Sequence, residues 1–362
     1  MTLVSIVGDF HSSIFPIFNN FKNKMTKHIL VYDNARKDTT NAKQFQKGIE
    51  KFVQKNSLNI KTEKIKVDED SLESLKACAQ AILKSSNNPS EIYINSTDGF
   101  STLNTVLDHE LFAHGVNFIA YDMYENEYNL LSKNGLEKRR VKKSLKIKDH
   151  FSLKGYTVRS SEFKEFAHKY EKEIYKLFTK HSKEYNEFLG LSPHKHPTVQ
   201  DAPNSKVKKL LVEMGLQKLP KQNMLITGGL FEYYVYNLVK NLDYDDIEVG
   251  LVIEREYAAS PVANEFDILI MKENHLHMIE CKYLNFLKKD ALVYKYIALS
   301  EIIDEDGKMI VASKEKKLKN SNDITLLPTV EKRGRLNNLY FRSDAHTDPV
   351  MFTMNVKSLF GL

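Results

Sequence analysis

Short apolar segments alternate with amphipathic segments through the first third of the chain, and this alternation constrains the fold more than any other feature. Five segments have the length and residue types of strands: Leu3 to Val7, His28 to Tyr32, Ile60 to Lys66, Glu91 to Asn95 and Asn117 to Tyr121. Four segments between them have helical spacing: Phe15 to Asn23, Ala42 to Gln54, Leu72 to Leu83 and Leu103 to Leu111. Strands that alternate with helices in this way predict a doubly wound α/β sheet.

Ligands of such sheets bind beyond the carboxyl ends of the strands, so the loops at these ends are candidate binding sites. The loop after the first strand contains Asp9, Phe10, His11, Ser12 and Ser13. The loop after the fourth strand contains Asn95, Ser96, Thr97, Asp98, Gly99, Phe100, Ser101 and Thr102. Hydroxyl and amide groups before a helix N-terminus suit phosphate oxygens. The same residue types are also good helix caps, and the absence of a Gly-x-Gly-x-x-Gly motif disfavours a nicotinamide dinucleotide site.

Two neighbouring segments in the last third of the chain predict a hairpin that carries charged residues. The segments around Asp267 and Glu280 are apolar, and the polar stretch from Lys272 to Asn274 between them is typical of a turn. Residues two apart on a strand point to the same face, so Glu280 and Lys282 point together. The hairpin would bring Asp267 beside them, and two carboxylates and an ammonium group would then converge.

Such a cluster suits phosphodiester hydrolysis. Magnesium and manganese prefer oxygen ligands, and a bound ion polarises the phosphate and lowers the pKa of the attacking water. Lys282 could stabilise the developing negative charge or orient that water. The spacing alone also arises by chance in a chain that is 28% charged. The apolar neighbours narrow the interpretation, because a charge among them is costly to bury without a partner. The segments therefore predict a metal-dependent nuclease core.

A helix before this hairpin offers a third carboxylate. Thr227, Gly228 and Gly229 open a segment whose apolar residues follow helical spacing, and Glu232 lies off the apolar face. Periodicity alone leaves open whether Glu232 joins the two other carboxylates or is an ordinary glutamate of a helix surface.

Length and composition bound the class of protein. A chain of 362 residues with 42% hydrophobic residues can form two globular domains. Cys78 and Cys281 form no paired motif, and no apolar stretch approaches the length of a membrane span, so we expect a cytoplasmic protein without a membrane segment. The net charge of +6 is modest, but basic clusters at residues 138–143, 314–319 and 332–335 could follow a phosphate backbone or could simply be solvated surface.

A helical pattern and a connection separate the two ends of the chain. Apolar residues from Ser161 to Leu189 follow helical spacing, and the stretch from Leu191 to Asn204 is rich in proline and polar residues. His194 and His196 within that stretch could in principle bind a metal ion, but we expect them to be an exposed pair of a linker. We expect an N-terminal domain over residues 1–145, a helical connector over 146–204 and a nuclease domain over 205–362.

This combination resembles a CRISPR-associated family that couples a Rossmann-like CARF sensor domain to a PD-(D/E)XK nuclease domain, whose fold is that of restriction endonucleases. The elements that carry the resemblance are the polar loop after the first strand, the Asn-x-Thr-x-Gly loop after the fourth, Gly228-Gly229-Leu230-Phe231-Glu232, Asn264-Glu265-Phe266-Asp267 and Glu280-Cys281-Lys282, which stand in the expected order. One difference is that Asp98 stands where the family commonly has a glycine. An aspartate near phosphates is unfavourable unless it caps a helix or binds ribose.

The resemblance implies an effector nuclease of type III CRISPR systems that is activated by a cyclic oligoadenylate, most often cyclic tetra-adenylate. Members are homodimers that bind this ring across paired sensor domains. They cleave single-stranded RNA or DNA, or nick DNA, with manganese or magnesium. Carried over to this chain, Asp267 and Glu280 would hold the metal ion, Glu232 would complete its shell, Lys282 would be catalytic, and the loops from Asp9 to Ser13 and from Asn95 to Thr102 would contact the ring.

Two other functions stay open from the sequence. The first is a restriction or repair endonuclease whose N-terminal domain recognises DNA without a nucleotide messenger. The second is a regulator that senses a nucleotide but does not cleave nucleic acid. The presence of Asp267, Glu280 and Lys282 disfavours this non-catalytic alternative.

Overall fold

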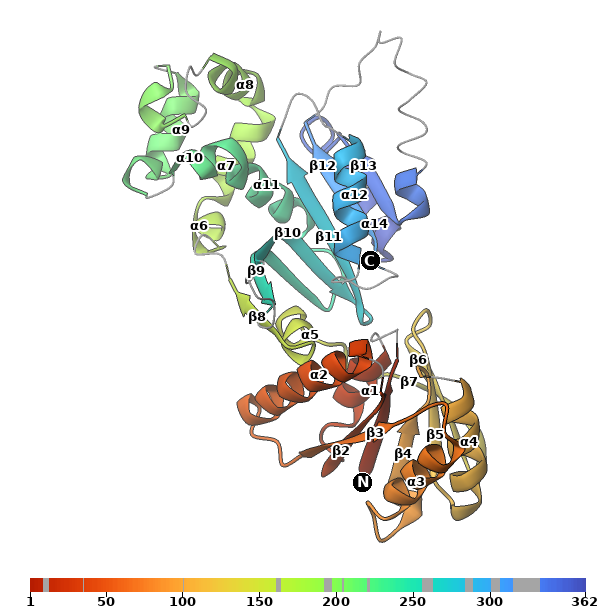
Figure 1. Ribbon diagram of the computed structural model, residues 1–362. Helices are drawn as coiled ribbons and strands as arrows, with labels where there is room; N and C mark the ends of the chain where they lie inside the picture. Colours follow the sequence, from red (N-terminus) through yellow and green to blue (C-terminus); the bar gives the residue numbers. More distant parts are fainter. Residues whose placement is uncertain are drawn as a thin grey trace. The chain divides into compact units, whose positions relative to one another are not determined.

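The computed structural model describes residues 1–8, 13–34, 36–99, 101–160, 164–191, 197–203, 205–219, 222–255, 263–283, 289–300, 307–314 and 333–362. Contacts divide the chain into two compact units (Figure 1). The first unit comprises Met1–Val158 and Ile253–Ala263, and the second comprises Arg159–Val252 and Asn264–Leu362. No helix in the described ranges combines the length and the apolar composition that a membrane span requires.

The first unit alternates strands and helices. Its strands are β1 (Thr2–Val7), β2 (Lys27–Asp33), β3 (Lys61–Val67), β4 (Ile92–Asn95), β5 (Asn117–Asp122), β6 (Glu127–Ser132) and β7 (Gly135–Arg140). Its helices are α1 (Ile14–Phe21), α2 (Arg36–Lys55), α3 (Leu72–Leu83), α4 (Ser101–Leu111) and α5 (Ile147–Leu153), with short 3-10 turns at η2 (Pro89–Glu91) and η3 (Phe112–His114). All five predicted strands and all four predicted helices are present, with ends that differ by a few residues.

The seven strands form one sheet in the order β3-β2-β1-β4-β5-β6-β7. Strands β3 to β5 are parallel, and β6 and β7 extend the sheet as antiparallel strands. Alternation along β1 places Leu3 and Val7 in one apolar cluster with α1 and α2, and Val4 and Ile6 in another with α3 and α4. Helices therefore cover both faces of the sheet, and the predicted doubly wound architecture is confirmed. Strands β1 and β4 are neighbours at the point where the strand order reverses, which is the usual ligand position in such sheets.

The second unit combines a sheet with several helices. The strands of its sheet are β9 (Asp246–Arg255), β10 (Ala263–Lys272), β11 (His275–Lys282), β12 (Met309–Ser313) and β13 (Leu339–Arg342), together with β8 (Tyr156–Arg159), within which the division between the two units falls. The helices are α6 (Lys164–Lys169), α7 (Glu171–Thr179), α8 (Ser182–Leu191), α9 (Lys206–Glu213), α10 (Gln222–Met224), α11 (Leu230–Val239), α12 (Lys289–Ser300) and α14 (Pro349–Phe360). Two 3-10 turns, η4 (Val199–Asp201) and η5 (Leu216–Lys218), and a π-helical turn, η6 (Leu225–Gly229), complete it.

The sheet of the second unit has the strand order β13-β12-β11-β10-β9-β8. Strands β10 and β11 form the predicted antiparallel hairpin, and β11, β12 and β13 run parallel. Glu273 and Asn274 have positive φ angles of 50° and 67°, which places the tight turn where the polar stretch predicted it. One face of the sheet packs against α11 and α14 through a large aromatic and aliphatic core.

The α/β fold class that the sequence predicts is confirmed in both units. Helices α7 and α8 contribute Ile174, Phe178 and Tyr185 to the core of the second unit. The predicted boundaries at residues 145 and 204 stay predictions.

Candidate functional site

The hairpin of β10 and β11 places the two predicted carboxylates side by side. The strands pair antiparallel with Ile268 opposite Ile279, so Asp267 and Glu280 follow as the next residues toward the open end of the hairpin. Ile268 and Ile279 belong to the large core, and the alternation of side chains turns Asp267 and Glu280 to the other face. The strand register and the alternation of side chains therefore place the two carboxylates next to each other on one face of the sheet.

The ammonium group of Lys282 connects these carboxylates. Its Nζ atom lies 2.5 Å from Glu280 Oε1 and 4.0 Å from Asp267 Oδ2. Asp267 Oδ2 also accepts a hydrogen bond of 2.7 Å from the backbone N–H of Cys281. Glu280 and Asp267 are 1% and 7% exposed, so both carboxylates are shielded from bulk water. The structure thus brings Asp267, Glu280 and Lys282 together as the sequence predicts.

Burial and mutual repulsion perturb the acidity of this cluster. Burial raises the pKa of Asp267 well above its ordinary value, and the charges of Glu280 and Glu232 add to this effect against Lys282 and the Cys281 N–H. Burial disfavours the charged form of Lys282, but Asp267 and Glu280 outweigh it, and the pKa of Lys282 is raised. Ionised carboxylates are therefore costly at this position, and a bound cation would lower that cost.

Glu232 lies on α11 and belongs electrostatically to the same cluster. Burial raises the pKa of Glu232 to about 7, with contributions from Glu265 and Glu280, while Lys282 opposes the rise. Glu232 is half-buried rather than an exposed glutamate of a helix surface. Of the two interpretations that periodicity left open, the structure favours a third carboxylate near Asp267 and Glu280.

A π-helical turn precedes α11 and shapes the space beside Glu232. The turn runs over Leu225–Gly229, and the carbonyl of Ile226 within it accepts a hydrogen bond from the buried hydroxyl of Tyr185. A Cβ atom added at Gly228 would lie 3.6 Å from Glu232 Oε1, so the missing side chain leaves room beside this carboxylate. Turns of this kind are frequent at functional sites.

Two residues of α12 that the sequence did not predict also belong to the cluster. Lys295 Nζ lies 3.0 Å from Glu280 Oε1, the same oxygen that Lys282 contacts. Tyr296 is 1% exposed, and burial raises its pKa, with Glu280 and Asp267 adding to the effect. The helix is separated from β11 by residues 283–288, so no spacing rule links Lys295 to Glu280. The sequence also offers Lys288 and Lys289 nearby, and nothing in the pattern selects Lys295 among them.

The donor set fits a hard divalent cation. In the described ranges no three His, Cys, Asp or Glu side chains form a ready metal cage. Mg²⁺, however, is commonly held by one or two carboxylates together with waters and substrate phosphates. Glu280 Oε2 is buried and has no hydrogen-bond partner among the described residues, which leaves one carboxylate oxygen unsatisfied. Asp267 and Glu280 therefore provide enough carboxylate ligands for a magnesium or manganese ion.

In the first unit, two glycines bring the predicted binding loops into contact. A Cβ atom on Gly8, after β1, would lie 2.7 Å from the backbone nitrogen of Gly99, in the loop after β4. Gly99 has a φ of 103°, and a Cβ there would lie 2.3 Å from Ile6 Cγ2. Neither position has space for a larger residue, because the two loops cross closely at the carboxyl ends of neighbouring strands.

Polar side chains hold these loops together. The Ser13 hydroxyl donates a hydrogen bond to Asp98 Oδ2, and Asn95 Nδ2 donates to the Ser13 carbonyl at 3.3 Å. Thr97 Oγ1 donates to Asn95 Oδ1 at 2.6 Å and accepts from the Tyr121 N–H at 2.7 Å. Burial raises the pKa of Asp98 to about 6, and the Ser13 hydrogen bond opposes this rise. Asp98 therefore links the loop after β4 to the end of the loop after β1 through its hydrogen bond with Ser13.

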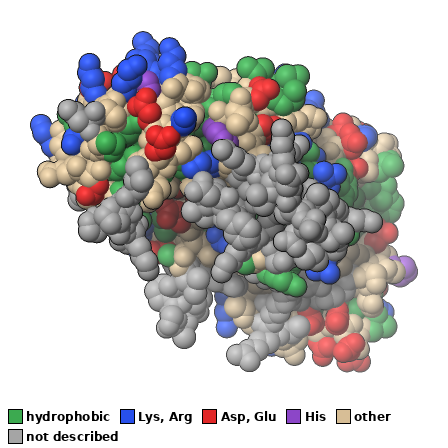
Figure 2. Space-filling view, turned by 90° about the horizontal axis from the view of Figure 1, so that it is seen from above, with side chains coloured by type: hydrophobic (Ala, Val, Ile, Leu, Met, Phe, Trp, Pro, Cys, Tyr) green, Lys and Arg blue, Asp and Glu red, His purple; other side chains and the backbone are tan. Residues whose placement is uncertain are grey.

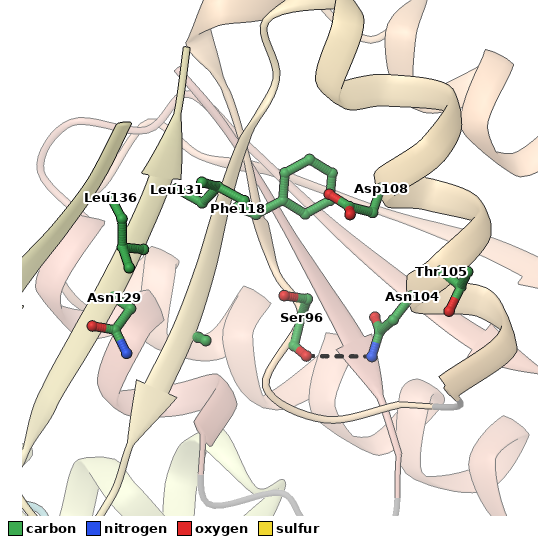
Figure 3. A pocket seen from close by; sticks show the side chains of 9 residues that line it. Ser96, Asn104, Thr105, Asp108, Phe118, Asn129, Leu131 and Leu136 are labelled. Atoms are coloured by element: carbon green, nitrogen blue, oxygen red, sulfur yellow. Dashed lines mark hydrogen bonds between the residues drawn. The ribbon is translucent and has the colours of Figure 1, made fainter. Parts of the chain in front are cut away.

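The remaining predicted sensor residues lie in different places. Ser101 and Thr102 begin α4 and are exposed. Ser96 lines a pocket of about 510 Å³ between α4 and the strands β5 to β7, where its carbonyl accepts a hydrogen bond from Asn104 Nδ2 at 3.3 Å (Figure 3). Asp9, Phe10, His11, Ser12 and Phe100 lie outside the described residues, as do His194 and His196. Ring contact by these loops stays a prediction.

The described residues of the basic clusters do not form a continuous positively charged surface. On β7, Lys138 pairs with Glu127 and Arg139 pairs with Glu137. Lys314 is buried with its Nζ 4.7 Å from the ring centre of Tyr283. Figure 2 shows acidic and basic side chains interspersed over much of the face it presents, with a group of Lys and Arg side chains at one edge. Most of residues 314–319 lies outside the described ranges.

Fold and site together define an α/β protein with a buried cluster of carboxylates and lysines of the nuclease type. Residues 220–331 match the family model of the Card1-like endonuclease domain. This segment is therefore similar to the Card1-like endonuclease domain, and the resemblance that the sequence predicts is confirmed. No curated protein matches the chain by sequence.

Three solved structures share the fold. The chain is similar to Can2 from Sulfobacillus thermosulfidooxidans, solved in complex with cyclic tetra-adenylate, with 17% identity, a TM-score of 0.72, and coverage of 99% of this chain and 98% of that one. It is also similar to VC1899 from Vibrio cholerae, with 13% identity, a TM-score of 0.77 and the same coverage. A third structure, a type III CRISPR defence DNA nuclease activated by cyclic oligoadenylate, has 12% identity and a TM-score of 0.51 and covers 87% of this chain and 45% of that one.

Proposed function

We propose that this protein is a metal-dependent nuclease that cleaves single-stranded RNA or DNA, or nicks duplex DNA, and is activated by a cyclic oligoadenylate in type III CRISPR antiviral defence. The observation that carries the proposal is the buried contact of Lys282 with Glu280 and Asp267 inside a domain of an endonuclease family. Buried carboxylates that repel one another are costly unless a cation compensates them, and a nuclease site supplies the reason to retain them.

Asp267 and Glu280 would hold Mn²⁺ or Mg²⁺, with Glu232 as a further ligand. When bound, the ion supplies polarisation of the phosphate and a lower pKa for the attacking water. Lys282 keeps its positive charge at neutral pH, because the two carboxylates raise its pKa. It would place that charge beside the phosphoryl oxygens or orient the water, and the burial of the site strengthens either effect.

The first unit would sense the activator. Can2 was solved with cyclic tetra-adenylate, which makes this ring the first candidate for the present chain. The loop that ends at Ser13 and the loop that begins at Asn95 are joined by a hydrogen bond beyond the carboxyl ends of β1 and β4, where doubly wound sheets bind ligands. A ring with two-fold symmetry presents the same chemistry to two identical pockets, so we infer an isologous homodimer as the binding species.

Substitution of the cluster tests the nuclease proposal. Glu280→Ala and Lys282→Ala are each expected to lower cleavage of labelled single-stranded RNA and DNA by at least about 100-fold with Mn²⁺ and cyclic tetra-adenylate. Binding of the ring, followed by calorimetry, should be unchanged. Glu187→Ala, on an exposed part of α8, is the matched control. Retained cleavage in both cluster variants would remove these residues from the mechanism.

A further inference from the structure

Helix α12 delivers a second lysine to the carboxylate that Lys282 already contacts. Lys295 Nζ lies 3.0 Å from Glu280 Oε1, and Lys282 Nζ lies 2.5 Å from the same atom. The other carboxylate oxygen of Glu280 is buried and has no described partner of hydrogen-bond geometry, although the buried Tyr296 hydroxyl interacts with this carboxylate. Two ammonium groups thus share one oxygen while its neighbour is left unsatisfied. A buried carboxylate oxygen without a partner lowers the stability of the fold, unless a further group normally binds to it.

A divalent cation cannot bind to Glu280 while both ammonium groups remain at this carboxylate. Two like-charged ammonium groups at hydrogen-bond distance from Glu280 would repel an ion bound by that carboxylate. One lysine must therefore move when Glu280 becomes a metal ligand. The structure indicates which of the two can move at the lower cost.

Lys282 is the fixed lysine of the pair. Its side chain is 31% exposed, it lies on the strand β11, and Asp267 is a second acidic partner at 4.0 Å. Lys295 has a side chain that is 48% exposed and reaches Glu280 from a helix. Among the described residues, Glu280 is its sole acidic partner within ion-pair distance. The ammonium group of Lys295 regains water when it leaves Glu280, and Lys282 remains paired with that buried carboxylate, so Lys295 can leave at a lower cost than Lys282.

We propose that Lys295 is a substrate-binding residue. It forms an ion pair with Glu280 in the enzyme without metal and substrate, and it contacts a phosphate oxygen of the nucleic acid when both are bound. This inference rests on the proposed nuclease function and extends it to a residue outside the hairpin. A lysine released from Glu280 remains within reach of the carboxylates, because its side chain extends from α12, which lies beside them. Its ammonium group is then free to pair with the phosphate that the site positions for cleavage.

Lys295 would therefore perform two tasks. In the absence of metal and substrate it neutralises Glu280 and lowers the cost of burying that carboxylate. In their presence it supplies positive charge to the substrate. The competing explanation is that Lys295 only attaches α12 to the sheet through an ion pair. The two explanations differ in the effect that removal of the lysine has on metal affinity.

The test compares Lys295→Ala, Lys295→Arg and Lys209→Ala in the full-length protein. Lys209 lies on α9, has a side chain that is 77% exposed and pairs with Glu213 at 4.0 Å, so it controls for loss of an ordinary surface lysine. Mn²⁺ binding is measured by electron paramagnetic resonance without nucleic acid. Cleavage is measured with Mn²⁺ and cyclic tetra-adenylate, and kcat and KM are determined separately.

For Lys295→Ala we expect Mn²⁺ to bind about fivefold more tightly, because the competing charge is gone. We also expect kcat/KM to fall by about 10- to 100-fold, with most of the loss in KM. Lys295→Arg should keep most of the substrate affinity, and Lys209→Ala should behave as the wild type. Tighter metal binding together with weaker substrate binding is a pair of changes that a structural ion pair does not produce.

The possible failures are distinguishable. Unchanged Mn²⁺ affinity and unchanged KM in Lys295→Ala would overturn the role of Lys295 and leave the nuclease proposal intact. A wild-type protein that binds no Mn²⁺ would overturn the nuclease proposal itself. Weaker Mn²⁺ binding in Lys295→Ala would also overturn the inference, because it would show that the lysine supports the metal site rather than competing with it.

Discussion

Replacement of Glu232 by glutamine should stabilise the metal-free protein in a way that depends on pH. Burial raises the pKa of Glu232 from its ordinary value of 4.5 to about 7. At about 1.36 kcal/mol per pKa unit, this rise corresponds to roughly 3 kcal/mol of folding free energy.

The sign of the effect follows from the raised pKa. At pH 4 the carboxyl group is mostly protonated in both the folded and the unfolded chain, so wild type and Glu232→Gln should have similar stability. Between pH 4.5 and 7 the unfolded chain ionises first, and the wild type loses stability progressively. Above pH 7 the full cost is present in the wild type, whereas glutamine has no charge to bury. The variant also removes one charge that raises the pKa of Asp267.

Hydrogen exchange of the α11 amides measures this effect locally, because two units need not unfold in a single step. Without metal, we expect the protection of Leu230–Val239 to rise in Glu232→Gln by up to about 3 kcal/mol at pH 8 and to be nearly unchanged at pH 4.5. Saturating Mn²⁺ should reduce the difference, and Glu187→Gln on the exposed face of α8 should show none. A difference that is constant with pH, or a variant that is less stable at pH 8, would refute the reasoning.

Three further predictions concern the loops and the metal. Gly99→Ala should destabilise the first unit by about 1–3 kcal/mol more than Gly135→Ala in urea unfolding, because both have positive φ but only Gly99 meets a neighbour, Ile6. Equal effects would contradict the close loop crossing. Ser13→Ala should lower the stability of the first unit by about 1–2 kcal/mol at pH 8 and by less at pH 5. The Ser13 hydroxyl stabilises the ionised form of Asp98, and this form predominates only above the Asp98 pKa of about 6. A loss of stability that does not depend on pH would contradict this role. Chelation of divalent metal should abolish cleavage while ring binding, measured by calorimetry, persists; full activity in the presence of chelator would contradict metal dependence.

Local sequence patterns predicted much of the fold because they report on burial. The strands of the parallel sheet are short and apolar, and the turn at Glu273 and Asn274 has polar residues that tolerate positive φ. Strand β7 escaped prediction because all six of its residues are exposed, so it has no apolar alternation. The segment around Lys138 and Arg139 was instead interpreted as a basic cluster, and these residues pair with glutamates.

The hairpin cluster was predictable because Asp267, Glu280 and Lys282 are related by strand periodicity and one turn. The contact of Ser13 with Asp98 was not, because 85 residues separate them and only the meeting of two loops joins them. Lys295 was hidden for the same reason, since the path between β11 and α12 determines which lysine reaches Glu280. Periodicity describes single elements, whereas these contacts arise from tertiary packing.

Cleavage assays with and without activator test the central claim most directly. Labelled single-stranded RNA, single-stranded DNA and supercoiled plasmid are incubated with Mn²⁺ and with cyclic tetra-adenylate, cyclic hexa-adenylate or no ring, with Glu280→Ala as the inactive control. We predict cleavage of at least one single-stranded substrate with one ring, foremost the tetra-adenylate, and no cleavage without a ring. Equal cleavage in the absence of any ring would contradict activation and favour a restriction or repair enzyme, and no cleavage under any condition would favour a regulator without catalysis.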